Sequence, residues 1–131
     1  MPDIHNKKSK ITIVAISAAR INAIEAIEEL ENEGLHCDIF HLVWLKPFKV
    51  SDQLLSSLEK TKLGLVIDTD FETCGASQSI SYELMLKTGA KVHGFGLVDK
   101  VSGVSKETEN LTPSRSEIKE KIKSILQQGK F

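Results

Sequence analysis

The chain has 131 residues, a formal net charge of -1, and a composition that is 40% hydrophobic and 27% charged. These values are typical of one soluble globular domain, and they give no reason to expect binding to nucleic acid or to an anionic membrane. Only 5% of the residues are aromatic, so few side chains can stack on bases. No apolar run approaches the roughly 20 residues that a membrane helix needs.

The first ten residues are polar and lack the apolar core of a secretory signal. We therefore expect a polar tail or a short edge strand over residues 1–10, and one domain over residues 11–131. Two cysteines without such a signal indicate free thiols, a reducing compartment and a cytoplasmic location.

Short apolar runs rich in β-branched residues alternate with amphipathic segments over the rest of the chain. The runs predict parallel strands that are buried on both faces, at residues 11–16, 36–42, 65–68 and 91–95. The segments after them predict helices, one over residues 20–33, one capped by Ser51, one opened by Ala76 or Ser77, and one opened by a capping box of Ser114 and Glu117. This rhythm is that of βα units, so we expect a three-layer α/β/α fold with a mainly parallel sheet.

The turn after the third predicted strand is where we expect any functional site, because ligand and partner sites gather beyond the carboxyl ends of parallel strands. The apolar run stops at residues 68–70, and Gly75 is expected to take a backbone conformation that other residues resist. A small anion could bind the backbone N–H groups that open the next helix, at Cys74, Gly75, Ala76 and Ser77. The Ser77 hydroxyl would be a further donor, while the nearby carboxylates oppose an anion.

The same turn also allows a catalytic interpretation. Asp68 and Asp70 form a pair that could hold Mg²⁺ or act as nucleophile and acid, but Glu72 stands where a phosphatase-like pattern needs Thr or Val. Cys74 precedes a helix and could be an activated nucleophile, but no histidine is close in sequence. The simpler interpretations are carboxylates that cap the turn and an inert thiol. No zinc spacing, dinucleotide fingerprint or phosphate-binding loop occurs in the sequence, so we expect no metal or cofactor site.

Several short elements follow one another in a characteristic order along the chain. They are ITIVAIS at residues 11–17, Glu33-Gly34-Leu35, Leu45-Lys46-Pro47-Phe48, LGLVID at residues 63–68, Thr73-Cys74-Gly75, and Leu111-Thr112-Pro113 with Ile118. Their order and spacing resemble the C-terminal domain of transketolase-like, thiamine-diphosphate-dependent enzymes, most of all the β subunit of 2-oxoacid dehydrogenase E1 components. Cys74 replaces the first glycine of the pair that this family usually shows.

The resemblance implies a parallel sheet in the strand order 2-1-3-4, which also places the most apolar strand inside. The family adds an antiparallel edge strand, which only residues 1–10 could supply here. It further implies that thiamine diphosphate and Mg²⁺ belong to the complete enzyme and are bound by preceding domains, so that this domain has no catalytic residue and binds no cofactor itself.

The resemblance implies four roles for such a domain: assembly, a contribution to the rim of the substrate channel, docking of an E2 acyltransferase, or a regulatory-ligand site. The partners would be a second copy and companion pyrimidine- and diphosphate-binding domains or subunits. We expect self-association through large apolar side chains on loops, namely Trp44, Leu45, Phe48 and Phe71. Two alternatives are a free-standing regulatory or small-ligand-binding module on the same fold, and an unrelated enzyme that uses Cys74 or the carboxylate pair.

Overall fold

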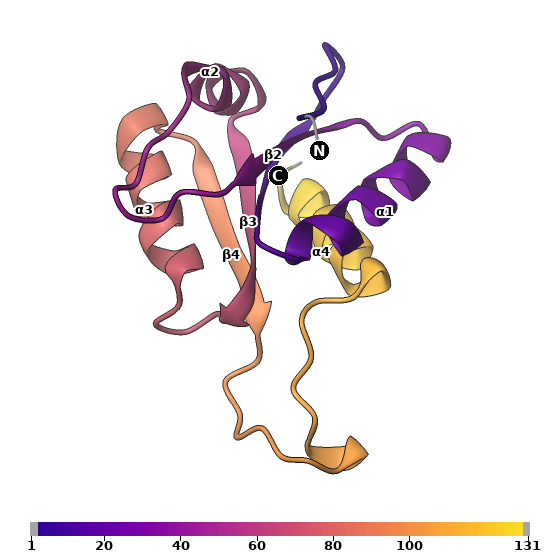
Figure 1. The fold of residues 1–131 in the computed structure, drawn as a ribbon. Coiled ribbons are helices and arrows are strands. Elements are labelled where there is room, and N and C mark those ends of the chain that lie inside the picture. The colour runs from indigo at the N-terminus through magenta and orange to yellow at the C-terminus, as the bar shows by residue number, and fades with distance from the viewer. Residues whose placement is uncertain (1–2, 130–131) are drawn as a thin grey trace.

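The structure is a computed structural model that describes residues 3–129, without the side chain of Thr108. Within that range the chain alternates strands and helices, in the order β1 (Ile11–Ile16), α1 (Ala19–Asn32), β2 (Cys37–Leu42), α2 (Asp52–Thr61), β3 (Leu63–Phe71), α3 (Ala76–Thr88), β4 (Lys91–Leu97), a short 3-10 helix η1 (Lys106–Thr108) and α4 (Arg115–Gln128). The strands form one parallel sheet in the order β2-β1-β3-β4, which confirms the predicted order. Helices α1 and α4 cover one face and α2 and α3 the other (Figure 1), so the three-layer prediction is also confirmed.

Several predicted ends of elements match the structure, because they depend on local chemistry. The Ser51 hydroxyl accepts a hydrogen bond from the Leu54 N–H at 3.2 Å and caps α2. Ser114 and Glu117 form the predicted capping box at the start of α4. Gly89 ends α3 in the left-handed conformation, with φ at 68°. None of the helices formed by the described residues is long and apolar enough to cross a membrane.

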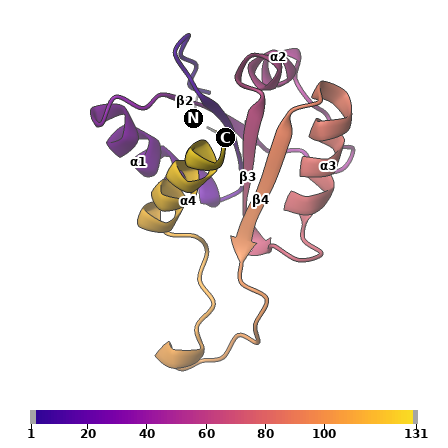
Figure 2. The same cartoon turned by 180° about the vertical axis from the view of Figure 1, so that it is seen from behind.

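Two strands are longer than the sequence predicts: β4 runs to Leu97 instead of residue 95, and β3 begins at Leu63 instead of residue 65. β3 continues past residue 68 to Phe71, and its pairing with β4 shifts between Ile67 and Phe71. The polar residues that end the apolar run therefore still belong to the sheet. After β4 the chain forms a long loop that extends away from the sheet and its helices before it returns to α4 (Figure 2).

Residues before β1 run along the outer edge of β2. Ile4 forms an isolated antiparallel bridge with Ile39, with N–H to oxygen distances of 3.1 and 2.9 Å. The antiparallel edge strand that the family resemblance implies is thus reduced, within the described residues, to this bridge.

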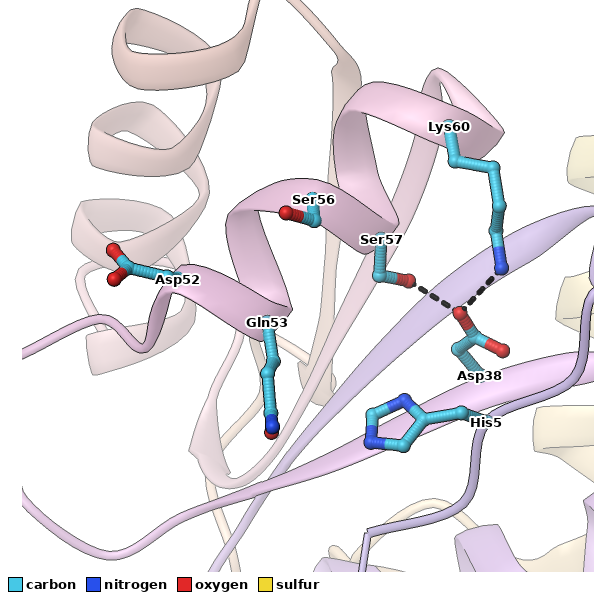
Figure 3. Close-up of a pocket in the computed structure, with 7 residues that line it drawn as sticks. All are labelled: His5, Asp38, Asp52, Gln53, Ser56, Ser57 and Lys60. Atoms are coloured by element: carbon cyan, nitrogen blue, oxygen red, sulfur yellow. Dashed lines mark hydrogen bonds and ion pairs between the residues drawn. The ribbon is translucent and has the colours of Figure 1, made fainter.

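A buried polar network joins the amino ends of β1 and β2 to α2 (Figure 3). The Asp38 carboxylate accepts a hydrogen bond from the Ser57 hydroxyl at 2.6 Å, and it forms an ion pair with Lys60 Nζ at 2.9 Å. The Thr12 hydroxyl lies 2.7 Å from Ser57 and 2.8 Å from the Thr61 hydroxyl. Burial alone would raise the pKa of Asp38, but hydrogen bonds, above all that from Ser57, hold this pKa below its ordinary value.

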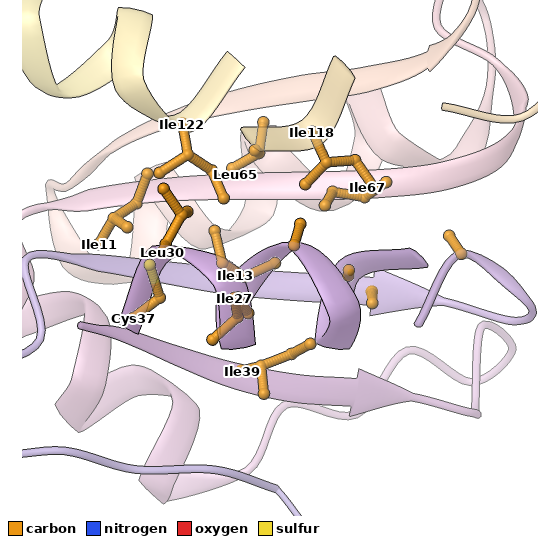
Figure 4. Close-up of a cluster of buried hydrophobic side chains, with 14 of the residues drawn as sticks. Ile11, Ile13, Ile27, Leu30, Cys37, Ile39, Leu65, Ile67, Ile118 and Ile122 are labelled. Atoms are coloured by element: carbon orange, nitrogen blue, oxygen red, sulfur yellow. The ribbon is translucent and has the colours of Figure 1, made fainter. Parts of the chain in front are cut away.

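The apolar core lies on both faces of the central strand β1, whose six residues are all buried. Alternate residues of a strand point to opposite faces, so Ile11 and Ile13 pack with α1 and α4 while Val14 and Ile16 pack with α2 and α3. Figure 4 shows the first of these clusters, in which side chains of the neighbouring strands β1, β2 and β3 meet those of α1 and α4. Burial on both faces explains why β1 reads as a continuous apolar run in the sequence.

Candidate functional site: an interface at the carboxyl edge of the sheet

The segment that follows β2 places large apolar side chains in solvent. Val43 and Trp44 are each 67% exposed, and Leu45 is 41% exposed. We call residues 43–45 the Trp44 segment. Monomeric proteins rarely leave such residues together at the surface unless they contact something. The exposure fits the predicted interface for Trp44 and Leu45.

Phe48 differs from its neighbours, because it is partly buried against the apolar cluster under α2 and α3, where Val50 also packs. Phe48 therefore contributes to the core, and its part in an interface stays a prediction. Phe71 is 36% exposed at the end of β3, where it pairs with Leu97. β1 lies between β2 and β3, so Phe71 is separated from the Trp44 segment by a strand.

Several hollows border the Trp44 segment, and two of them lie against helices. One, of about 290 Å³, lies between the segment and α3 and is lined mainly by apolar groups of Leu45, Phe48, Ala76 and Ile80. The other, of about 280 Å³, lies between the end of β2 and the start of α2, and Trp44 forms part of its wall. Apolar side chains that stand between hollows can both insert into a partner and receive its side chains. This shape is suited to a protein interface.

The turn after β3 is closed by its own carboxylate. Asp68 is 3% exposed, and its two oxygens accept hydrogen bonds from the backbone N–H of Ser77 and of Asp70, each at 3.2 Å. This supports the capping interpretation of the carboxylate. It also removes one of the donors that the predicted anion site needs, because the Ser77 N–H is already engaged. The Ser77 side chain is fully buried and faces Gly94 rather than solvent, so its hydroxyl does not open onto the turn.

The backbone of this turn differs from the expectation at two residues. Cys74, not Gly75, takes the left-handed conformation, with φ at 62°. Gly75 has an extended backbone with φ at -84°, and it is required for space: a Cβ here would lie 1.9 Å from the Phe71 carbonyl oxygen. The family's glycine pair is therefore explained by two separate demands, and Cys74 meets the first of them at a conformational cost.

The catalytic interpretations gain little from the geometry. Cys74 is exposed, and its own N–H donates to Gln78 Oε1 at 3.1 Å. Cys37 is buried in the core, where burial and then the charge of Asp38 raise its pKa to about 12. Asp70 accepts a hydrogen bond from the Phe71 N–H at 2.7 Å. Both thiols are free, as predicted.

The residues present do not fit a thiamine diphosphate and Mg²⁺ site. Across the described residues no group of three or more His, Cys, Asp or Glu side chains could hold a metal ion. Asp68, the buried carboxylate at the end of the apolar run, already accepts a backbone hydrogen bond at each of its two oxygens. That this chain binds no cofactor stays a prediction, which a calorimetric titration with thiamine diphosphate and Mg²⁺ can test.

Sequence reasoning missed the polar network at Asp38. It borders a hollow of about 390 Å³ that is also lined by His5, Gln53 and Ser56. Asp38 lies 19 residues from Ser57 and 22 from Lys60, so no local spacing signals the contact. A lone Asp inside an apolar strand was the available signal, because a buried carboxylate needs partners.

The arrangement of the sheet and its helices defines a three-layer α/β/α domain of the transketolase C-terminal kind. Comparison with known proteins then identifies the family. The family model described as the transketolase C-terminal domain matches residues 3–116, and the chain belongs to this family.

Two relatives show how much of a longer protein the chain matches. A stretch of 75 residues is 32% identical to the pyruvate dehydrogenase E1 component subunit beta of Mesostigma viride, which is 57% of this chain and 23% of that protein. A solved split gene transketolase, described as an inactive beta4 tetramer, matches 92% of this chain and 39% of its own, with a TM-score of 0.73 and 23% identity. At that identity the likeness shows the fold. The chain spans well under half the length of either relative.

Proposed function

We propose that this chain is the non-catalytic assembly domain of a thiamine-diphosphate-dependent enzyme, of the type of the 2-oxoacid dehydrogenase E1 β subunit. Thiamine diphosphate and Mg²⁺ would bind to companion domains or subunits. The observation that carries the proposal is the exposed Trp44 segment at the carboxyl edge of the sheet. The stretch of identity with a pyruvate dehydrogenase E1 β subunit supports the choice of enzyme type.

The proposed mechanism is burial of the Trp44 segment in an interface. Covering apolar surface stabilises a complex by roughly 25 cal/mol per Å². A standard interface covers about 800 Å² on each partner, close to a tenth of the 7835 Å² that this chain exposes. The Trp44 segment would be the apolar centre of such an interface, with polar residues around it.

Three kinds of partner fit this role, and we favour a second copy of the chain together with companion pyrimidine- and diphosphate-binding domains. The third kind is an E2 acyltransferase that docks on the same domain. The domain could also contribute to the rim of a substrate channel. Affinity purification from the native host followed by mass spectrometry distinguishes them, because companion subunits and an acyltransferase would appear as different proteins. We also propose a reducing, cytoplasmic location, which the two free thiols support.

The test of self-association is light scattering over a range of concentrations. We expect a dimer or larger oligomer at roughly tens of micromolar, and a shift toward monomer in Trp44→Glu with the fold retained. Tyr82→Glu is the matched control, because Tyr82 is an aromatic residue that is 59% exposed on α3 and lines neither of the two hollows beside the segment. A wild-type monomer at high concentration, or equal shifts in both variants, contradicts the proposal.

A second candidate function is a small-ligand-binding module. The apolar hollow of about 290 Å³ between Leu45 and α3 favours it. The two functions differ in the binding that Ser79→Trp should weaken, since the tryptophan would fill that hollow from the exposed side of α3. A ligand module would lose its ligand, whereas an assembly domain would lose its partner.

A further inference from the structure

A buried cation lies at the start of α1, near the carboxyl end of β2. The Arg20 side chain is only 3% exposed. A guanidinium in such a position is stable only if an anion and hydrogen-bond acceptors accompany it. Asp3 supplies an anion, since its Oδ1 lies 3.3 Å from Arg20 Nη1.

A second donor converges on the same oxygen. The backbone N–H of His41, on the edge strand β2, donates to Asp3 Oδ1 at 2.9 Å. One carboxylate oxygen is thus held between a buried cation and a strand N–H. An arginine and a backbone amide form a binding site for a carboxylate, since the planar guanidinium matches its geometry.

The group that fills this position is lightly attached. The Asp3 side chain is 36% exposed, and the next residue, Ile4, contributes only an isolated bridge to Ile39. Asp3 and His41 also form part of the wall of the hollow of about 280 Å³ beside Trp44. The carboxylate can therefore be approached from solvent, whereas Arg20 is fixed in the core.

We infer that Arg20 and the His41 N–H form a carboxylate-binding site, which in this conformation is occupied by the chain's own Asp3. The ligand class is a monocarboxylate, either a small molecule or an acidic side chain of a partner strand. Because Asp3 is tethered beside the site and already seated in it, an outside carboxylate binds appreciably only when Asp3 is displaced. This inference does not rest on the assembly role.

The test is chemical rescue of Asp3→Ala. The substitution takes a carboxylate away from Arg20, so the thermal midpoint should fall. Sodium acetate at about 100 mM should then raise the midpoint of the variant by about 3–5 °C relative to sodium chloride at equal ionic strength. Wild-type protein should gain less than about 1 °C, because Asp3 already fills the site.

Two measurements keep the test decisive. Asp99→Ala, which removes an exposed loop carboxylate, is the control and should show no acetate-specific gain. In nuclear magnetic resonance spectra of Asp3→Ala, acetate should shift the His41 amide signal saturably. If Asp3→Ala is unfolded, acetate should restore a dispersed spectrum. The inference is overturned if acetate gives Asp3→Ala no more than it gives the wild type and the control, or restores no structure to an unfolded variant.

Discussion

At the amino ends of β1 and β2 buried polar side chains satisfy one another, whereas at the carboxyl end of β2 large apolar side chains lie in solvent. Asp38, which is 1% exposed, has hydrogen-bond partners from α2 and from the segment before β1. Trp44, six residues further along the chain, is 67% exposed. The comparison shows that the domain satisfies its polar groups at the amino edge by itself and leaves apolar side chains uncovered at the end of β2, where we propose that a partner binds.

The largest effect should come from breaking the amino edge. Asp38→Ala leaves Ser57 and the Asn6 N–H without their acceptor, and Lys60 without its anion. Loss of one member of a buried charged network typically costs about 3 kcal/mol, so urea unfolding should show a drop of that size. Ser56, which is nearby and exposed, provides the control: Ser56→Ala should change the free energy of unfolding by less than about 0.5 kcal/mol. Equal effects would contradict the view that the network completes this edge.

The same network predicts a dependence of stability on pH. The pKa of Asp38 is lower in the folded protein than its ordinary value, so its contribution is complete above the unfolded pKa of about 3.9 and is lost as pH falls through the folded pKa. Thermal midpoints measured from pH 7 down to pH 2 should therefore fall more steeply for the wild type than for Asp38→Asn. Parallel curves would show that Asp38 contributes no such linkage.

A smaller effect separates the two aromatic residues around Pro47. Phe48 is partly buried in the core, so Phe48→Ala should cost about 1–2 kcal/mol of unfolding free energy. Trp44→Ala should cost less than about 0.5 kcal/mol in the monomer, because its side chain touches mainly solvent. Urea unfolding at low protein concentration measures both. A reversed order would mean that Trp44 belongs to the core.

The smallest expected change is a gain in stability at the turn after β3. Cys74 holds a left-handed backbone that glycine adopts without strain. Cys74→Gly should therefore stabilise the fold by about 0.5–1 kcal/mol, once the greater freedom of glycine in the unfolded chain is subtracted. A loss of stability would indicate that the thiol makes a contact that offsets the strain.

The sequence predicts the features of this molecule that are set within a few residues. The apolar run of β1 predicts a buried strand, and the spacing of Ser114 and Glu117 predicts the start of α4. The long-range polar contacts are different, because each joins distant parts of the chain. Arg20 meets Asp3 across 17 residues and Asp38 meets Ser57 across 19, and no periodicity encodes such a pair.

The turn after β3 shows another reason why the sequence does not predict every backbone conformation. Gly75 and Cys74 are adjacent, and the sequence suggests that the glycine is the residue with the unusual backbone. The structure assigns that backbone to Cys74, whereas Gly75 is required because the carbonyl of Phe71 approaches it too closely for a Cβ. The Phe71 carbonyl belongs to the extension of β3 beyond residue 68, and the polar side chains of residues 68–70 hide that extension from hydrophobic patterning.

The most direct test of an open carboxyl edge uses the fluorescence of Trp44, which is the single tryptophan of the chain. In dilute solution we predict emission like that of tryptophan in water and full access to acrylamide, since the side chain is 67% exposed. At concentrations where light scattering detects oligomers, the emission should move to shorter wavelength and quenching by acrylamide should fall. Emission that stays unchanged while the protein associates would contradict the claim that this edge is the interface.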